Sequence, residues 1–140
     1  MLMRLIYASE ASQPLGPGEL EALLASARRG NERRALTGLL VFDHRAFLQV
    51  LEGEAARVSE VFCRIAADTR HRRVLIIDAR AVAERLFGDW SMGFAAADAA
   101  GSAQFLRFGG GAGFDPHALA ADSALGLLRA LGPRATGAAA

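Results

Sequence analysis

The amino-acid sequence predicts an α+β fold, in which helices pack on a β-sheet. Short runs of β-branched, leucine and aromatic residues bounded by turn formers recur along the chain and indicate strands. Two longer stretches place apolar residues every three or four positions, as an amphipathic helix does. The chain has 140 residues, of which 52% are hydrophobic and 22% charged. This size and composition suit one globular domain with one core.

The first half of the chain alternates these elements. Residues 3–9 (MRLIYAS) form the first predicted strand, which the turn-forming stretch QPLGPG ends. A helix over 19–29 follows, because its leucines recur at helical spacing, and the pair GN at 30–31 marks its exit. Residues 37–42 (TGLLVF) and 46–52 (AFLQVLE) are the next two strands, joined as a hairpin.

The second half adds one helix and two strands. The helix is predicted over 55–68, and the strands over 73–79 (RVLIIDA) and 90–95. The order strand–helix–strand–strand–helix–strand is the split βαβ pattern of ferredoxin-like folds, here with one further strand. In that topology we expect the first and third strands to be parallel neighbours at the centre of the sheet, with both helices on one face.

Composition changes near the end of the last strand, so we divide the chain into a domain at 1–97 and an extension at 98–140. The first part of the extension, through residue 113, is rich in alanine and glycine and is predicted to be a linker. A helix is predicted over 115–131, with Asp115 as its N-cap and a Gly-Pro pair as its end. The final ATGAAA is predicted to be disordered.

The face of the sheet away from the two main helices is expected to be covered. Residues 39–42 (LLVF) and 74–77 (VLII) are continuous apolar runs, which are typical of strands buried on both faces. The predicted helix over 115–131 offers leucines that can pack there. We therefore expect it to dock on this face and to help form a homodimer or a partner surface.

Composition argues against several classes of function. All sixteen cationic side chains are arginine, so a Schiff-base lysine and a P-loop lysine are absent. The net charge is only +1, and the arginine clusters lie at a helix end and in a loop, which argues against a nucleic-acid partner. The three histidines lack metal-ligand spacing, and the single cysteine has no evident catalytic partner. With no apolar run of membrane-spanning length and no signal-peptide pattern, we expect a cytoplasmic protein without a membrane partner.

One glutamine stands out within the predicted strand FLQVLEG. Alternate side chains of a strand share a face, so Gln49 points with Phe47 and Leu51 toward a face that is expected to be buried. An unpartnered buried amide costs about 1–3 kcal/mol. Tyr7 lies on the neighbouring central strand, so its hydroxyl and the Gln49 amide are expected to meet in one pocket. Either the two groups only satisfy one another, or they serve a bound molecule.

Five motifs occur in the order and spacing of a known family. RLIYAS, N-x(5)-TGLL, FLQVLEG, D-x-R-H and WSMGF lie between residues 2 and 95. Together they resemble the BLUF domain, a family of blue-light sensors that use flavin. The resemblance implies a noncovalent oxidised flavin between the two helices, FAD first, with FMN or riboflavin as alternatives. It makes Tyr7 the photoactive tyrosine and Gln49 the glutamine that switches.

The resemblance also implies which residues contact the flavin. The implied set comprises Leu23 and Ile65, which sandwich the ring, Phe47 and Leu51 on its floor, the switching Gln49, Asn31, Arg64 and Asp68 at the ring edge, and Arg70 and His71 near the ribityl or phosphate end. Taken singly, most of these residues are also explained as core or helix-surface positions. Relatives often carry a polar residue where this chain has Gly30, so one ring contact is expected to be lost.

The implied function is that of a photoreceptor rather than an enzyme. In the family, light drives transfer of an electron and a proton from the tyrosine, and the glutamine then rotates or tautomerises. The flavin ends chemically unchanged with a stronger hydrogen bond to its C4 carbonyl, which shifts its absorption to the red. Trp90 and Met92 share a strand face and are the expected signal relay. No output domain follows, so the signal is expected to pass to a separate downstream protein, and a homodimer or higher homo-oligomer is the expected assembly.

Two other classes of function, an enzyme and an RNA-binding module, fit a small ferredoxin-like domain. A flavin oxidoreductase needs a nicotinamide site, and a hydrolase needs a nucleophile–base pair; the sequence indicates neither. Multiple-turnover oxidation of reduced nicotinamide would identify the former. An RNA-binding sheet stacks bases on exposed aromatic residues, whereas the central strand here carries FLQVL. A colourless protein with salt-sensitive RNA affinity would identify that class.

Overall fold

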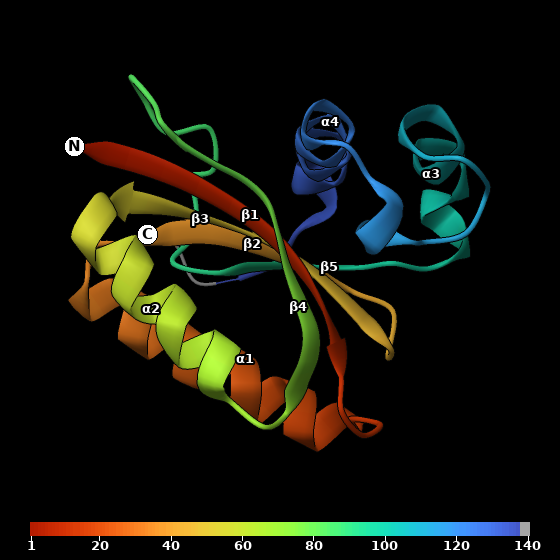
Figure 1. Ribbon diagram of the computed structural model, residues 1–140. Coiled ribbons are helices and arrows are strands. Elements are labelled where there is room, and N and C mark those ends of the chain that lie inside the picture. Colours follow the sequence, from red (N-terminus) through yellow and green to blue (C-terminus); the bar gives the residue numbers. More distant parts are fainter. Residues whose placement is uncertain (138–140) are drawn as a thin grey trace.

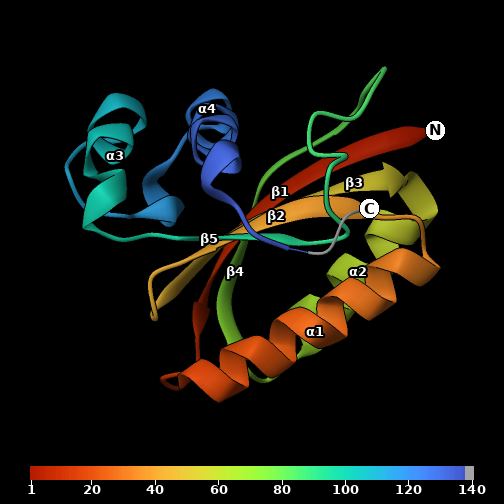
Figure 2. The same cartoon turned by 180° about the vertical axis from the view of Figure 1, so that it is seen from behind.

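The computed structural model describes residues 1–137 as three layers built around a five-stranded sheet (Figure 1). The strands are β1 (Leu2–Ala11), β2 (Thr37–Phe42), β3 (Ala46–Glu54), β4 (His71–Ala81) and β5 (Gly93–Ala96), and they lie in the order β4-β1-β3-β2-β5. One face carries α1 (Pro17–Arg33) and α2 (Ala55–Ala67), and the other carries α3 (Ser102–Phe108) and α4 (Ala121–Leu131), as the two opposite views show (Figures 1 and 2). We call these the inner and outer faces. The predicted α+β, ferredoxin-like fold is confirmed.

The direction of the central strands differs from the prediction. β1 and β3 are neighbours, but they run antiparallel, with Tyr7 directly opposite Gln49. The α1 crossover leaves β1 and β2 parallel, and the tight turn after β2 reverses β3, which lies beside both. β5 runs parallel to β2. The prediction of parallel central strands was therefore wrong, although the same residues are adjacent.

The exit of α1 also differs from the prediction. The helix continues past Gly30 and Asn31 to Arg33, and the chain leaves it through Ala35, whose φ of 52° is left-handed. Glycine usually occupies such a position, because its missing Cβ removes the steric cost. Here an alanine takes it, and the glycine that suggested an earlier exit lies inside the helix.

The first part of the C-terminal extension is not a plain linker. After the short turn η1 (Ala99–Gly101) it forms α3, whose Phe105 is 4% exposed. The ring of Phe108 lies directly over Gly126 of α4, where any Cβ would collide with it. Alanine and glycine dominate this stretch, but its two phenylalanines give it an apolar face, and that face folds it against α4.

The predicted helix over 115–131 is two elements. η2 (Pro116–Ala118) comes first, Leu119 is extended, and α4 follows with Ala120 at its N-cap position. Asp115 therefore precedes the η2 turn and is not the N-cap of α4. After α4 the chain passes through the turn η3 (Gly132–Arg134).

Part of the predicted disordered tail pairs with the sheet. Thr136 exchanges two backbone hydrogen bonds with Phe94 of β5, at 2.7 and 2.9 Å. Because β5 is the last strand on its side, its outer edge offers unpaired backbone groups, and the tail satisfies them. Residues 138–140, which the same prediction covers, lie outside the described residues.

Two hydrophobic clusters separate the layers. The inner cluster, between the sheet and α1–α2, includes Tyr7, Phe47, Leu51 and Met92. The outer cluster joins the other side of the same strands to the extension, through Ile6, Leu48, Val50, Leu127, Leu128 and Leu131. The prediction that the extension covers the outer face is confirmed for β1, β2 and β3. The run at 74–77 was wrongly predicted to be buried on both faces, because it lies on the edge strand β4, where Leu75 and Ile76 are exposed.

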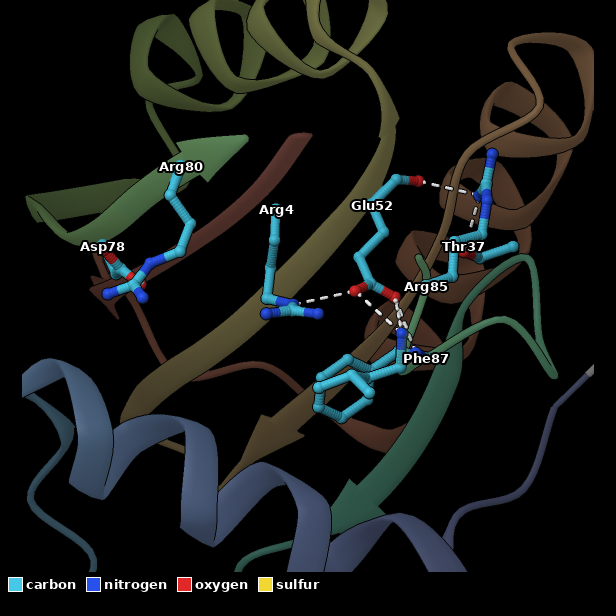
Figure 3. A network of polar contacts seen from close by, with 8 residues as sticks. Arg4, Thr37, Glu52, Asp78, Arg80, Arg85 and Phe87 are labelled. Carbon is cyan, nitrogen blue, oxygen red and sulfur yellow. Dashed lines mark hydrogen bonds and ion pairs between the residues drawn. The ribbon is translucent and has the colours of Figure 1, made fainter. Parts of the chain in front are cut away.

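A buried carboxylate fixes the loop that leads into β5 (Figure 3). Glu52 is fully buried and accepts a hydrogen bond from Arg4 Nε at 2.8 Å. It also accepts the backbone N–H groups of Leu86 and Phe87, at 3.0 and 2.6 Å. A buried charge is tolerated only when it is paired and hydrogen-bonded. The loop between β4 and β5 is therefore anchored to β3, and this anchor sets the position from which the chain enters β5.

β4 forms one free edge of the sheet. Leu75 and Ile76 are 44% and 50% exposed there, and two register shifts interrupt the pairing of β4 with β1. Arg72 pairs with Glu10 at 3.1 Å, and Arg80 with Asp78 at 2.8 Å. Within residues 1–137, no helix is long and apolar enough to cross a membrane, and no group of three or more metal-ligating side chains is present.

Candidate functional site

A cavity of about 230 Å³ lies between α1, α2 and the inner face of the sheet. All the residues predicted to contact a flavin line it, except Leu51. Leu51 is fully buried in the inner cluster, two positions beyond Gln49 on β3. The sequence also missed part of the lining, which comprises Ser26, Ala27, Gly30, Arg33, Arg34, Leu40 and Val61. The missed residues on α1 follow Leu23 at steps of three or four positions. The helix face that carries Leu23 could therefore have predicted them from the sequence.

Tyr7 and Gln49 form a buried pair at the base of the cavity. Their strands place them opposite each other, and the Tyr7 hydroxyl donates a hydrogen bond to Gln49 Oε1. Tyr7 is 1% exposed and Gln49 5%. Burial raises the pKa of Tyr7 well above its ordinary value of 10.0, so the phenol keeps its proton at neutral pH. The hydroxyl therefore acts as a donor, and the amide must present its oxygen to it.

Met92 contacts the other end of the same amide. Gln49 Nε2 donates to Met92 Sδ at 3.3 Å, and Met92 is fully buried. Trp90, the alternative relay residue, is only half-buried and lies in the loop before β5, which begins at Gly93 rather than at residue 90. The sequence could not choose between the two, because both were placed on one strand face. In this structure, Met92 is the residue that faces Gln49.

Asn31 holds the entry to β5 from the opposite wall. Its Nδ2 donates to the Ser91 carbonyl at 2.7 Å, and the side chain is 3% exposed. The amide nitrogen of Asn31 is therefore engaged by the backbone, while the side chain as a whole lines the cavity. The Ser91 hydroxyl itself is buried without a hydrogen-bond partner among residues 1–137.

The charged end of the cavity lies where α2 runs into β4. Arg70 Nη2 lies 2.6 Å from Asp68 Oδ2, and this contact lowers the pKa of Asp68 to about 2. His71 Nδ1 lies 2.9 Å from Ser9 Oγ, and burial lowers the pKa of His71, so the ring is neutral at pH 7. Arg64 pairs with Glu60 at 3.1 Å instead of with Asp68. Both Arg64 and Asp68 still line the cavity.

Two arginines of the cluster at the end of α1 make specific contacts. Arg28 Nε donates to the Met92 carbonyl at 2.9 Å, and its Nη2 donates to the Thr136 carbonyl at 3.3 Å. Arg34 donates to the Gly30 carbonyl at 3.0 Å and lies in the cavity wall. Arg28 contacts backbone that lies far along the chain, which local sequence patterns do not reveal.

Comparison with known proteins identifies the family. The family model for BLUF, sensors of blue light using FAD, matches residues 2–93. The chain therefore belongs to the BLUF family of blue-light sensors, whose domains bind flavin.

The curated relatives carry this domain within larger proteins. The β subunit of a photoactivated adenylate cyclase from Euglena gracilis is 32% identical over 92 residues, which are 65% of this chain but 11% of that protein. The blue light- and temperature-regulated antirepressor BluF of Escherichia coli K12 is 30% identical over 92 residues, 66% of this chain and 23% of that protein. The chain thus spans about a tenth of the length of the cyclase relatives that it matches.

Among solved structures, BlsA in its photo-activated state superposes with a TM-score of 0.86 at 29% identity, covering 94% of this chain and 95% of that one. BlrP1 of Klebsiella pneumoniae, solved with FMN and cyclic diGMP, gives a TM-score of 0.62 at 35% identity, over 67% of this chain and 25% of that one. The likeness to BlsA extends beyond the family domain into the C-terminal extension.

The residues of the cavity fit a flavin. The ring system is flat and mostly apolar, with one polar edge of carbonyls and an imide. Leu23 and Ile65, from α1 and α2, supply apolar walls, and Asn31 and Gln49 supply amide groups. Arg70 lies at the charged end, where a cation suits a phosphate.

Proposed function

We propose that the chain is a photoreceptor that binds FAD noncovalently between α1 and α2 and signals without turning over a substrate. The observation that carries the proposal is the double engagement of the Gln49 amide. Its oxygen accepts from Tyr7 and its nitrogen donates to Met92. An amide held at both ends by different groups has one preferred orientation, and loss of the Tyr7 donor removes the main cause of that preference.

In the proposed site, each residue has a distinct role in holding the flavin. Leu23 and Ile65 sandwich the ring, Phe47 lies beneath it, and Asn31 binds its carbonyl and imide edge. At the other end, Arg70 and His71 hold the ribityl and phosphate part. Arg64 and Asp68 address the edge of the ring, and Leu51 supports Gln49 from the core below.

The switch follows from the protonation of Tyr7. When bound, the flavin would supply light absorption and would accept both the electron and the proton that Tyr7 gives up. A Tyr7 hydroxyl that has given up its proton can only accept a hydrogen bond, so Gln49 Oε1 loses its donor. Reorientation or tautomerisation of the Gln49 amide then places a hydrogen-bond donor opposite the Tyr7 oxygen. The group that Met92 faces changes at the same time, because Gln49 Nε2 contacts Met92 Sδ.

The proposed output passes through β5 to the C-terminal extension. Met92 immediately precedes β5, and Arg28 joins the Met92 carbonyl to that of Thr136. We propose that the extension offers the surface for a separate signalling protein or for a second copy of the chain. The names of the relatives, an adenylate cyclase and an antirepressor, support coupling of this domain to different outputs.

An absorption spectrum tests the proposal. The purified protein is expected to be yellow, and blue light is expected to shift its flavin bands to the red with slow recovery in the dark. Reconstitution with FAD, FMN and riboflavin in parallel identifies the flavin, and FAD is expected to bind most tightly. A protein that takes up none of the three under native conditions contradicts the proposal, as does multiple-turnover oxidation of reduced nicotinamide.

A further inference from the structure

Arg34 occupies an unusual position for a charged residue at a helix end. It is the C-cap of α1, yet its side chain is only 12% exposed and forms part of the cavity wall. Its Nη1 donates to the Gly30 carbonyl at 3.0 Å. A guanidinium carries five N–H donors, and this is the single hydrogen bond that the group makes within residues 1–137. Donor capacity therefore remains at the cavity wall.

Gly30 provides the space for this guanidinium. A Cβ at residue 30 would lie 3.0 Å from Arg34 Nη1, which is tighter than an ordinary contact. The two residues are one helical turn apart, so they share a face of the helix. The sequence suggested that glycine at this position removes a polar group from the site. The structure brings a stronger donor to the same wall.

The charge of Arg34 is only partly neutralised. Glu60 Oε1 lies 3.5 Å from Arg34 Nη2 and 3.1 Å from Arg64 Nη2. One carboxylate thus serves two guanidinium groups, and the cluster, which joins α1 to α2 at the cavity, carries one net positive charge. Asn31, three residues before Arg34, lies on the same side of α1 and lines the same cavity.

We propose that Arg34 is a flavin-binding residue that donates to the carbonyl and imide edge of the ring and places a positive charge beside it. This assignment rests on the proposed function and on the assignment of that edge to Asn31. A cation near the imide favours its deprotonated form, so the pKa of the imide N–H falls. The same charge favours electron uptake by the ring, which is the step that draws on Tyr7. The alternative is that Arg34 only ties α1 to α2 through Glu60.

Titration of the bound flavin in the full-length protein separates these roles. Arg34→Gln is expected to weaken FAD binding roughly tenfold, as loss of a charge-assisted hydrogen bond does. It is also expected to raise the pKa of the bound imide by at least about one unit, read from the flavin absorption spectrum in the dark. Arg34→Lys keeps the charge but loses the planar fork, so it should preserve most of the imide pKa and lose part of the affinity.

Two further variants act as controls. Glu60→Gln breaks the tie to α2 but leaves the charge of Arg34 in place, and it is expected to lower the imide pKa below that of wild type. A purely structural Arg34 predicts instead that Glu60→Gln and Arg34→Gln behave alike. Arg29→Gln removes an equal charge from an exposed position of α1 outside the cavity lining, and should leave both affinity and pKa unchanged.

The outcomes distinguish this assignment from the proposed function. Wild-type protein that takes up no flavin overturns both. Wild-type protein that binds FAD, while Arg34→Gln keeps its affinity and imide pKa, overturns the assignment of Arg34 alone. If Arg34→Gln does not fold, Glu60→Gln and Arg34→Lys decide. An imide pKa that Glu60→Gln leaves unchanged, together with wild-type FAD affinity in Arg34→Lys, contradicts the assignment.

Discussion

Gln49 Nε2 lies 3.3 Å from Met92 Sδ, across the boundary between the centre of the sheet and the start of β5. Sulfur is a weak hydrogen-bond acceptor, whereas the Tyr7 hydroxyl at the other end of the amide is a strong donor. The orientation of Gln49 is therefore set by Tyr7, and Met92 is positioned to respond to it.

Gln49→Leu is expected to retain flavin and to lose the light-induced red shift. Leucine fills the space of the amide but neither donates nor accepts a hydrogen bond, so the change at Tyr7 has no amide to act on. Difference spectra before and after blue light measure the effect. Gln13→Leu, in the exposed loop after β1, is the matched control and should keep the full shift. A normal reversible shift in Gln49→Leu would refute the role of Gln49.

Stability is expected to fall as the pH rises above 10. In the unfolded chain Tyr7 ionises near its ordinary pKa of 10.0. In the folded protein burial raises the pKa of Tyr7, so the phenol keeps its proton. The contribution of the protonated Tyr7 to the free energy of unfolding is therefore fully present below pH 10. Above pH 10 the free energy of unfolding falls by about 1.4 kcal/mol per pH unit. The chain has one tyrosine and no lysine, so few other groups titrate in this range.

Urea unfolding at stepped pH values, with Tyr7→Phe alongside, checks this expectation. The variant should show a nearly flat dependence on pH over the same interval, because phenylalanine has no proton to release. Tyr7→Phe should also lack the productive light response. A wild-type protein as insensitive to alkaline pH as the variant would show that Tyr7 is not buried as described.

Met92→Ala is expected to change the rate of dark recovery or the signal output more than Trp90→Ala does. Met92 is fully buried against the Gln49 amide, whereas Trp90 is half-buried in the preceding loop. Recovery of the dark spectrum after a light pulse gives the rate directly. If both variants recover and signal as wild type does, the segment that leads into β5 is not the relay.

Deleting residues 102–140 is expected to leave flavin binding and the light response in place. The cavity lining contains no residue of the deleted part, but the outer cluster loses Leu127, Leu128 and Leu131. The truncated protein should therefore change in solubility, assembly state or partner binding, which light scattering and size-exclusion chromatography measure. A truncated protein that stays soluble, keeps its assembly state and still signals would contradict the proposed role of the extension.

A milder variant measures the energy of this packing. Leu128→Ala removes a fully buried side chain of α4 and should lower the free energy of unfolding by about 2–5 kcal/mol. Leu106→Ala, on α3 and 60% exposed, is the control and should change it by less than about 0.5 kcal/mol. Equal effects of the two substitutions would mean that the extension is not stably docked.

The sequence predicted what depends on local periodicity. Strand alternation placed Gln49 and Tyr7 on the inner face, and helical spacing located α1 and α2. Strand direction was missed, because it depends on how the hairpin reverses the chain. The contacts of Arg28 were missed because its partners lie 64 and 108 residues away, and no local pattern encodes such distances. Trp90 and Met92 were equivalent by spacing, and only tertiary packing distinguishes them.

The free edge of β4 bears on how the protein behaves at high concentration. Exposed edges are templates for sheet extension between copies, and Leu75 and Ile76 would favour such aggregation. Antiparallel pairing of two β4 edges centred on Ile76, however, sets Arg72 of each copy opposite Arg80 of the other. Like charges directly opposite across strands are destabilising, and the register shifts of β4 distort the edge further. Low ionic strength should therefore preserve monodispersity at this edge, and concentrated salt, which screens the arginines, should erode it.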